Sequence, residues 1–193
     1  MCGSSSAVSN RALGMMVFAG QSNGDVPHMG DDYSSVRTHA CVNVAVGGTM
    51  VSSYWSSGQT GFLALKSRID IQTAFAPSAP IKILWCQGEG EATAEGTAAT
   101  YGSYMVAFAD ALESQTGRSD IIWIDVLLGT AVNPVSLPAF ATVNTQKTTV
   151  FHPTRSGRII VRNPDSYAGG YSDGIHYDAT RRAAATADWY AQW

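Results

Sequence analysis

The sequence predicts an α/β protein in which helices cover both faces of a parallel sheet. Strand-like apolar segments alternate along the chain with segments of helical periodicity, and this order is typical of parallel sheets. Residues 121–128 are almost continuously apolar, as expected for a parallel strand that is buried on both faces. Three glycine-rich turns directly follow strand-like segments, at the positions where such sheets bind ligands.

Five strands are predicted, each from a short run of large apolar or β-branched residues that ends at a turn. In chain order they are Met15–Ala19, Cys41–Val46, Ile81–Cys86, Ile121–Leu128 and Arg158–Arg162. We expect the strands of Cys41 and Cys86 to flank the first strand, which places the two residues roughly 9–10 Å apart. A disulfide needs Cα atoms within about 7 Å, so we predict no bond between these cysteines.

Helices are predicted where apolar residues recur every three or four positions. The predicted ranges are Phe62–Ala76, Thr93–Gln115, Ala139–Val150 and Ala179–Trp193. Pro77 and Pro80 close the first helix, and Gly117 follows the second, where helix ends favour glycine. In the third helix, Thr148–Val150 also favours an extended chain. Residues 24–37 and 163–174 are predicted loops.

The composition indicates one globular domain over residues 1–193. Hydrophobic residues make up 45% of the chain and charged residues 14%, and we find no internal repeat or linker. The net charge is −3 without a basic cluster, so nucleic acid is not an expected partner. No apolar run approaches the roughly 20 residues of a membrane span, and no signal peptide is predicted, although the chain could be excised from a larger protein. The three cysteines show no CxxC spacing, which argues against a zinc site.

The first glycine-rich turn contains a candidate nucleophile. The strand predicted at Met15–Ala19 runs into Gly20-Gln21-Ser22-Asn23. A serine held in a tight turn beyond a strand can expose its hydroxyl, as nucleophilic catalysis requires. The alternative is that Ser22 or Asn23 only caps a helix or makes a turn.

Two further glycine-rich turns follow the second and third strands. Gly47-Gly48-Thr49 has two adjacent glycines, which let backbone N–H groups turn toward a ligand without interference from a Cβ atom. Gln87-Gly88-Glu89 ends the third strand. Each of them alone could be an ordinary turn. Because the carboxyl ends of parallel strands meet at one sheet edge, we expect all three turns to gather there.

A histidine and an aspartate near the C-terminus are candidate partners of Ser22. Asp173 and His176 are three residues apart, between the fifth strand and the last helix. This spacing lets the aspartate accept a hydrogen bond from Nδ1–H of the imidazole and leaves Nε2 to face a nucleophile. The alternative is that Asp178 caps the last helix and His176 is an incidental loop residue.

The chain contains four short motifs whose residues and order resemble those of the SGNH (GDSL-like) hydrolases. They are Gly20-Gln21-Ser22-Asn23, Gly47-Gly48-Thr49, Gln87-Gly88-Glu89 and Asp173-Gly174-Ile175-His176. More narrowly they are similar to the carbohydrate-esterase branch, which includes sialate O-acetylesterase-like and acetylxylan esterase-like proteins. With their flanking residues, the motifs run from residue 17 to residue 178. Together with the order of elements, the resemblance implies a three-layer α/β/α sandwich with a flavodoxin-like, five-stranded parallel sheet. The chain is shorter than many members, and residues 163–171 show no clear family pattern, so the rim of the pocket is the least defined part.

The resemblance assigns a Ser-His-Asp triad. Ser22 is then the nucleophile, His176 is the general base and later the general acid, and Asp173 orients His176. No metal or cofactor is implied.

The resemblance also assigns an oxyanion hole. It combines the backbone N–H of Ser22, a backbone N–H of Gly47 or Gly48, and the side-chain amide of Gln87. Gln87 stands where the wider superfamily has asparagine. Glu89 is expected to support this turn, or else to place a negative charge at the start of the following helix.

The sequence therefore predicts a serine esterase that removes small acyl groups, above all O-acetyl, from a carbohydrate through an acyl-enzyme. Tyr54, Trp55 and Tyr177 lie in polar loops, where their rings could stack on a sugar or simply pack the loops. Three alternatives stay open: an esterase for a non-carbohydrate ester, a non-catalytic glycan-binding module, and a metal site made by His176, Asp173 and Glu89. The glycan, the position of its acetyl group, the localisation and the oligomeric state are not predicted.

Overall fold

The protein is built on one parallel sheet of five strands. The computed structural model describes residues 14–21 and 39–192, so Ser22 and the loop predicted at 24–37 lie outside the described residues. The strands are β1 (Gly14–Gly20), β2 (His39–Asn43), β3 (Ile81–Cys86), β4 (Ile122–Val126) and β5 (Ile159–Arg162). Their order is β2-β1-β3-β4-β5, and every pairing is parallel. This is the flavodoxin-like order, which confirms the predicted sheet.

The strand order also tests the prediction for the two cysteines. Cys41 lies on β2 and Cys86 ends β3, with β1 between these strands. Cys41 pairs in register with Met16, and Cys86 with Gly20, so the two cysteines are offset along β1 as well. No disulfide joins Cys41 to Cys86, as predicted.

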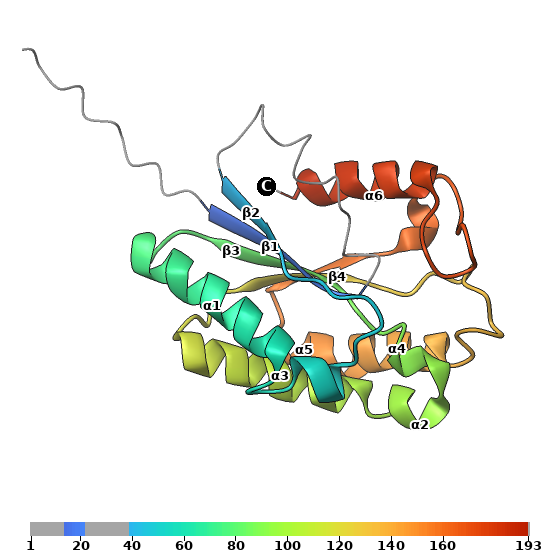
Figure 1. The fold of residues 1–193 in the computed structure, drawn as a ribbon, viewed down its shortest axis with the longest axis horizontal. Helices are drawn as coiled ribbons and strands as arrows, with labels where there is room; N and C mark the ends of the chain where they lie inside the picture. Colours follow the sequence, from blue (N-terminus) through green and yellow to red (C-terminus); the bar gives the residue numbers. More distant parts are fainter. Residues whose placement is uncertain (1–13, 22–38, 193) are drawn as a thin grey trace, which may run out of the picture.

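Helices cover both faces of the sheet, as Figure 1 shows. On one face lie α1 (Thr60–Phe75), α3 (Tyr101–Thr116) and α4 (Phe140–Gln146), and on the other lies α6 (Ala179–Tyr190). Alternate residues of β1 explain the two layers. Met15 and Val17 belong to the core under α1 and α3, whereas Met16 and Phe18 belong to the core under α6, because successive side chains of a strand point to opposite faces.

The second strand is shorter than predicted. β2 ends at Asn43, although the backbone N–H groups of Val44 and Val46 still donate to carbonyls of Phe18 and Gly20. The side chain of Asn43 accepts a hydrogen bond from the backbone N–H of Ala45 at 2.8 Å. Such local side-chain bonds compete with a strand ladder, and this one lies where the regular strand ends.

The helix predicted at Thr93–Gln115 is broken into three pieces. A 3₁₀ turn, η3 (Glu91–Thr93), and the short α2 (Glu95–Ala98) precede α3. Ala94 is extended between the first two. The hydroxyl of Thr97 donates to the carbonyls of Glu91 and Ala94 at 2.7 and 2.8 Å, which holds the irregular start in place. The end is as predicted, because Gly117 takes the left-handed conformation with φ 67°.

The helix predicted at Ala139–Val150 forms and extends further. After α4 the chain continues as a π-helical segment, η4 (Lys147–Phe151), and a last turn, α5 (His152–Thr154). The tendency of Thr148 and Thr149 toward extended chain is overridden. Their hydroxyls donate to the carbonyls of Asn144 and Thr145 at 3.0 and 2.7 Å, as threonines inside helices can.

The core between the sheet and α3 is aromatic. Trp85 of β3 stacks on Phe108 of α3 at 5.0 Å between ring centroids. Trp55, from the π-helical segment η2 (Val51–Trp55), meets the edge of Trp85 at 5.1 Å. Such large rings bury much apolar surface, and they fix the turns beyond β2 and β3 on which the predicted site depends.

Candidate active site

The ends of β1 and β3 are in direct backbone contact at the predicted site. Gly20 has φ +107°, and a Cβ atom on it would lie 2.2 Å from the carbonyl oxygen of Cys86. The next residue, Gln21, donates its backbone N–H to the same carbonyl at 2.6 Å. Glycine is therefore required at position 20 for both steric and conformational reasons. Ser22 follows immediately, outside the described residues.

The side chain of Gln21 joins the first turn to the third. Its residue is 1% exposed, and its Oε1 accepts from the backbone N–H groups of Gly88 and Gly90 at 3.1 and 3.0 Å. These bonds fix the residue before Ser22 against the turn that carries Gln87. Sequence reasoning assigned Gln21 no role, although its place beside the candidate nucleophile could have indicated one.

Gln87 joins the second turn to the third. Its Nε2 donates to the carbonyl of Thr49 at 2.8 Å and lies 3.3 Å from Oε2 of Glu91. Both N–H groups of the predicted oxyanion donor are thus directed at protein acceptors. The Oε1 of Gln87 is buried and has no hydrogen-bond partner among the described residues. A buried acceptor of this kind is uncommon, and a bound donor group would satisfy it.

Glu91 is a second residue that sequence reasoning missed. It is 2% exposed, and its Oε1 accepts from the backbone N–H of Val51 at 2.5 Å. Burial raises the pKa of its carboxyl group, while the bonds from Val51 and Gln87 oppose that shift. Glu91 connects the start of η2, beyond Gly47 and Gly48, to the Gln87 turn.

The two candidate glycines lie at the surface of this edge. Gly47 and Gly48 are both exposed, and only Gly48 has a positive φ, +71°. The turn is closed by the Thr49 hydroxyl, which donates to the carbonyl of Val46 at 2.8 Å and accepts from Nε1 of Trp55 at 3.1 Å. Thr49, the residue after Gly48, is bonded to Gln87, but this contact does not distinguish between Gly47 and Gly48 as donors.

Asp173 and His176 are in contact. Oδ2 of Asp173 lies 2.5 Å from Nδ1 of His176, with both side chains about half exposed, 53% and 43%. The other oxygen, Oδ1, accepts from the backbone N–H groups of His176 and Ile175 at 2.7 and 3.0 Å. The pKa of Asp173 is held well below its usual range by three hydrogen bonds. The largest effect comes from the backbone N–H of His176, followed by its imidazole and by the backbone N–H of Ile175.

The loop that carries Asp173 and His176 is held by hydrogen bonds within itself and to neighbouring segments. Tyr171 and Tyr177 form an antiparallel bridge, inside which Ser172 donates its N–H to the carbonyl of His176 at 2.8 Å. The carbonyl of Gly174 accepts from the backbone N–H of Asn133 at 2.7 Å. Asp178 caps α6 by accepting the backbone N–H of Arg181 at 2.8 Å. The helix cap predicted as an alternative and the Asp173–His176 contact therefore occur together.

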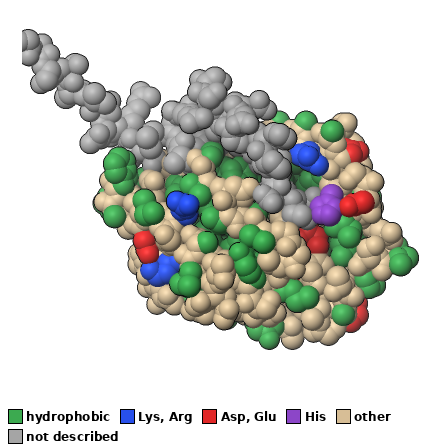
Figure 2. All heavy atoms as spheres, in the orientation of Figure 1, with side chains coloured by type: hydrophobic (Ala, Val, Ile, Leu, Met, Phe, Trp, Pro, Cys, Tyr) green, Lys and Arg blue, Asp and Glu red, His purple; other side chains and the backbone are tan. Residues whose placement is uncertain are grey.

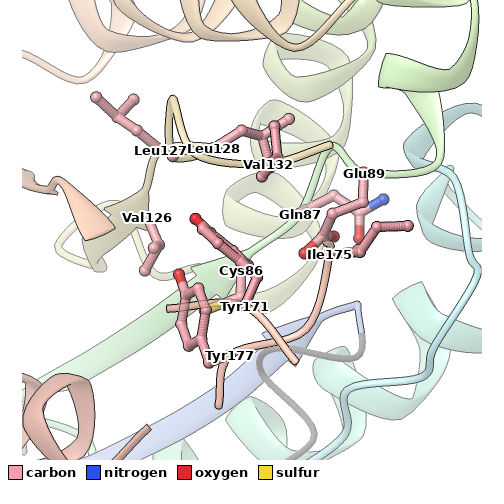
Figure 3. A pocket seen from close by; sticks show the side chains of 11 residues that line it. Cys86, Gln87, Glu89, Val126, Leu127, Leu128, Val132, Tyr171, Ile175 and Tyr177 are labelled. Carbon is pink, nitrogen blue, oxygen red and sulfur yellow. The ribbon is translucent and has the colours of Figure 1, made fainter. Parts of the chain in front are cut away.

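A hollow lies beside the Asp173–His176 pair at the carboxyl ends of β3 and β4, shown in Figure 3. It holds about 280 Å³ of empty space, part of which is open solvent. Gln87 and Glu89 line one side of it, and Glu89 is 8% exposed. The remaining lining comes from β3, β4, the segment after β4 and the Tyr171–Tyr177 loop: Cys86, Val126, Leu127, Leu128, Gly129, Val132, Tyr171, Ile175 and Tyr177.

The predicted aromatic platform differs from the structure. Trp55 is fully buried in the aromatic core and Tyr177 is buried against β1 and β3, so neither ring is open to stack on a sugar. The packing interpretation holds for both residues. Both residues lie in polar segments of the sequence, but their rings turn inward and join the two core clusters. Tyr54 keeps a partly exposed ring that meets the edge of Trp55 at 5.3 Å.

Three further observations concern metal ions, membranes and the distribution of basic side chains. Within the part of the chain that the structure describes, no three or more His, Cys, Asp or Glu side chains are grouped to hold a metal ion. Over residues 14–21 and 39–192, no helix is long and apolar enough to cross a membrane. On the face drawn in Figure 2, the coloured Lys and Arg side chains are scattered rather than clustered.

Comparison with known proteins identifies relatives of the chain. Residues 16–180 match the family described as carbohydrate esterase, sialic acid-specific acetylesterase. No curated protein matches the chain.

Solved structures share the fold at low sequence identity. A protein of Arabidopsis thaliana has a TM-score of 0.62 at 16% identity, over 84% of this chain and 65% of its own, so this chain spans less than two thirds of that protein. NanS has a TM-score of 0.62 at 11% identity, over 94% of this chain and 98% of its own. A GDSL-like lipase from Bacteroides thetaiotaomicron has a TM-score of 0.58 at 13% identity, over 92% and 86%.

Proposed function

The chain belongs to the family of sialic acid-specific acetylesterases among the carbohydrate esterases, and from this premise we propose that it is a serine esterase that removes O-acetyl groups from a carbohydrate. Membership of the family supports an ester-hydrolysing enzyme. The single observation that carries the serine mechanism is the contact of Asp173 with Nδ1 of His176 at 2.5 Å. With Nδ1 engaged, Nε2 is the nitrogen that exchanges a proton with the nucleophile.

In the proposed reaction, Oγ of Ser22 attacks the ester carbonyl carbon while Nε2 of His176 takes its proton. The tetrahedral intermediate collapses, the bond to the sugar oxygen breaks, and that oxygen leaves with the proton from His176. Water then attacks the acyl-enzyme, again with His176 as the base, and acetate and the free serine are released. Asp173 stays ionised and holds the imidazole in place, consistent with its lowered pKa.

In this reaction, the oxyanion of the tetrahedral intermediate forms where the turns after β1, β2 and β3 meet. We place its donors at the backbone N–H of Ser22, one N–H from Gly47 or Gly48, and the amide of Gln87. The N–H of Gln87 that points at Glu91 makes the longer contact, 3.3 Å against 2.8 Å to Thr49. Because both N–H groups share one planar amide, donation to the oxyanion requires the whole amide of Gln87 to rotate from these contacts, and Glu89 supports the turn.

The test is hydrolysis of p-nitrophenyl acetate by the wild type and by Ser22→Ala, with and without a chelator. We expect turnover by the wild type, no effect of the chelator, and a loss of several orders of magnitude in kcat on removal of the nucleophile. Acetate release from acetylated xylan, O-acetylated sialic acids and bacterial polysaccharides then identifies the glycan. A folded wild type that does not turn over would favour a glycan-binding module, and Ser22→Ala at the wild-type rate would exclude the triad.

A further inference from the structure

The loop that presents His176 begins at Tyr171 and ends at Tyr177. These two residues form its antiparallel bridge, and their rings lie 5.6 Å apart between centroids, next to each other in Figure 3. The side chains of Asp173 and His176 are 53% and 43% exposed. Because packing restrains such open side chains only weakly, the position of the pair depends on how the backbone of the loop is held.

One end of this loop is held by burial and the other by a buried cation. Tyr177 is 4% exposed and belongs to the core under α6. Tyr171 is only partly buried, and the guanidinium carbon of Arg181 lies over its ring, 4.6 Å from the centroid. Arg181 itself is 6% exposed. A guanidinium is attracted to an aromatic face at this distance, and more strongly away from water, so Arg181 holds the ring of Tyr171.

Arg181 also holds the chain just before the loop. Its Nη2 donates to the carbonyl of Gly169 at 2.9 Å. Gly169 has φ +92°, and a Cβ atom on it would lie 2.5 Å from the backbone nitrogen of Arg181. The carboxylate of Asp178, which caps α6, also accepts from the backbone N–H of Gly170 at 2.6 Å. The first turn of α6 and the start of the loop are therefore bonded to each other.

Stability alone does not explain a buried cation at this position. Among the described residues, no ion pair joins Arg181 to a carboxylate. Two other buried arginines, Arg118 and Arg155, are both ion-paired. Burial of a charge without such a partner is costly, and the start of a helix disfavours positive charge. What Arg181 contacts instead is the start of the loop.

We propose that Arg181 is a positioning residue of the triad, whose guanidinium holds Gly169 and the ring of Tyr171 and so fixes the loop that presents His176. The proposal rests on the proposed serine-esterase function. The side chain of Arg181 bonds the carbonyl of Gly169 rather than Asp173 or His176. It therefore acts through the loop and takes no part in proton transfer.

The first test compares kcat and KM for p-nitrophenyl acetate in the wild type, Arg181→Met and Arg181→Lys. Methionine keeps an apolar stem but has no charge and no N–H donor. We expect Arg181→Met to lose kcat by on the order of 10²-fold with little change in KM, since a misplacement of 1 Å can cost that much. Arg181→Lys keeps the charge but lacks the planar fork that stacks and donates together, so its kcat should lie between the other two.

Arg155→Met is the matched control, because Arg155 is 4% exposed and pairs with Glu113. This pair lies at the other edge of the sheet, where Arg158 joins Glu113 to the carbonyl of Ile121 before β4. Arg155→Met should lower the free energy of unfolding in urea and leave kcat of the folded protein at the wild-type level. An equal loss of kcat in Arg155→Met and Arg181→Met would reveal a general effect of stability and overturn the proposal.

The second readout is the imidazole tautomer of His176, measured by ¹⁵N NMR without substrate and therefore independent of Ser22. In the wild type, Asp173 should keep the proton of the neutral ring on Nδ1, whereas in Arg181→Met the two tautomers should mix. A wild-type tautomer or a wild-type kcat in Arg181→Met would overturn the proposal.

Should Arg181→Met not fold, Arg181→Lys decides by the same two readouts, and wild-type values of both would overturn the proposal. Retained activity in Ser22→Ala would instead remove the function on which the proposal rests. The tautomer would then still test separately whether Arg181 positions the ring of His176.

Discussion

At the scale of single residues, buried polar side chains join the turns of the candidate site. Gln21 binds the turn of Gly88 and Gly90, and Glu91 reaches both Val51 and Gln87. The contacts of Gln21 with Gly88 and Gly90, and that of Glu91 with Val51, connect segments that are far apart in the sequence. In the mechanism that we propose, these contacts preorganise the oxyanion donors, which is the condition for strong electrostatic catalysis.

Replacing Glu91 by alanine should affect stability and activity together. The change leaves the buried N–H of Val51 without its acceptor, which costs about 1–3 kcal/mol, and it releases the amide of Gln87. We expect a lower free energy of unfolding in urea and a lower kcat for p-nitrophenyl acetate. The control is Glu95→Ala, because Glu95 is exposed and its side chain accepts a hydrogen bond from the Thr142 hydroxyl. If Glu91→Ala matches this control in both measurements, Glu91 does not hold the start of η2 and the Gln87 turn together.

Replacing Asp173 by asparagine should have a pH-dependent effect on stability. The pKa of Asp173 is lowered in the folded protein from an ordinary value of 3.8, so the folded state binds this proton more weakly than the unfolded state does. The stabilising contribution is therefore complete above about pH 4 and is lost as the pH falls toward the lower, folded-state pKa.

Thermal unfolding of the wild type and Asp173→Asn at several pH values checks this dependence. The difference in Tm should be largest at neutral pH and should shrink below about pH 4. At neutral pH the variant should also lose kcat, by on the order of 10⁴-fold if the triad operates as proposed. A difference in Tm that stays constant from pH 7 down to pH 2 would contradict the assigned hydrogen bonds.

At the scale of elements, a buried ion pair fastens the π-helical segment to the sheet. Lys147 of η4 and Asp125 of β4 are both fully buried, with 2.9 Å between Nζ and Oδ1. Nζ also donates to the carbonyl of Val126 at 2.5 Å, and Nε2 of His152 lies 2.7 Å from the other carboxylate oxygen. The π-helical geometry and α5 thus bring two basic side chains onto one buried carboxylate.

Lys147→Met should strongly destabilise the protein. It leaves Asp125 buried with His152 as its remaining basic partner, and removing one member of a buried pair costs about 3–5 kcal/mol. Lys66→Met is the matched control, because Lys66 pairs with Asp70 on the exposed side of α1, and such pairs contribute about 0–1 kcal/mol. Urea unfolding measures both, and equal effects would show that the Asp125 contact does not anchor η4.

At the scale of the whole molecule, the order of elements was predictable and their irregular ends were not. Alternating apolar strands and periodic helices determine a parallel sheet, and β3 has the predicted bounds. The breaks before α3 and within η4 depend on side-chain bonds, such as those of Thr97 and Lys147, to residues that the fold brings close. A local pattern carries no information about such partners.

The same distinction applies to the candidate site. Asp173 and His176 are close in sequence, so their spacing allowed the contact to be predicted before the fold was known. Gln21 and Glu91 bind residues 67 and 40 positions away, so their roles require the folded chain. For Trp55 and Tyr177 the sequence left stacking on a sugar and packing of the loops both open, and the structure buries both rings. Contacts between residues close in sequence can therefore be predicted from spacing, whereas the scaffold contacts of Gln21 and Glu91 cannot.

The most direct test of the central claim is to trap the nucleophile. The protein is treated with a fluorophosphonate, which modifies activated serines, and the labelled peptide is identified by mass spectrometry. The account predicts one modification on Ser22 in the wild type and none in Ser22→Ala, with labelling strongly slowed in His176→Ala because the base that activates the serine is gone. Labelling of another residue, or equal rates in the wild type and His176→Ala, would contradict the assignment of Ser22 and His176.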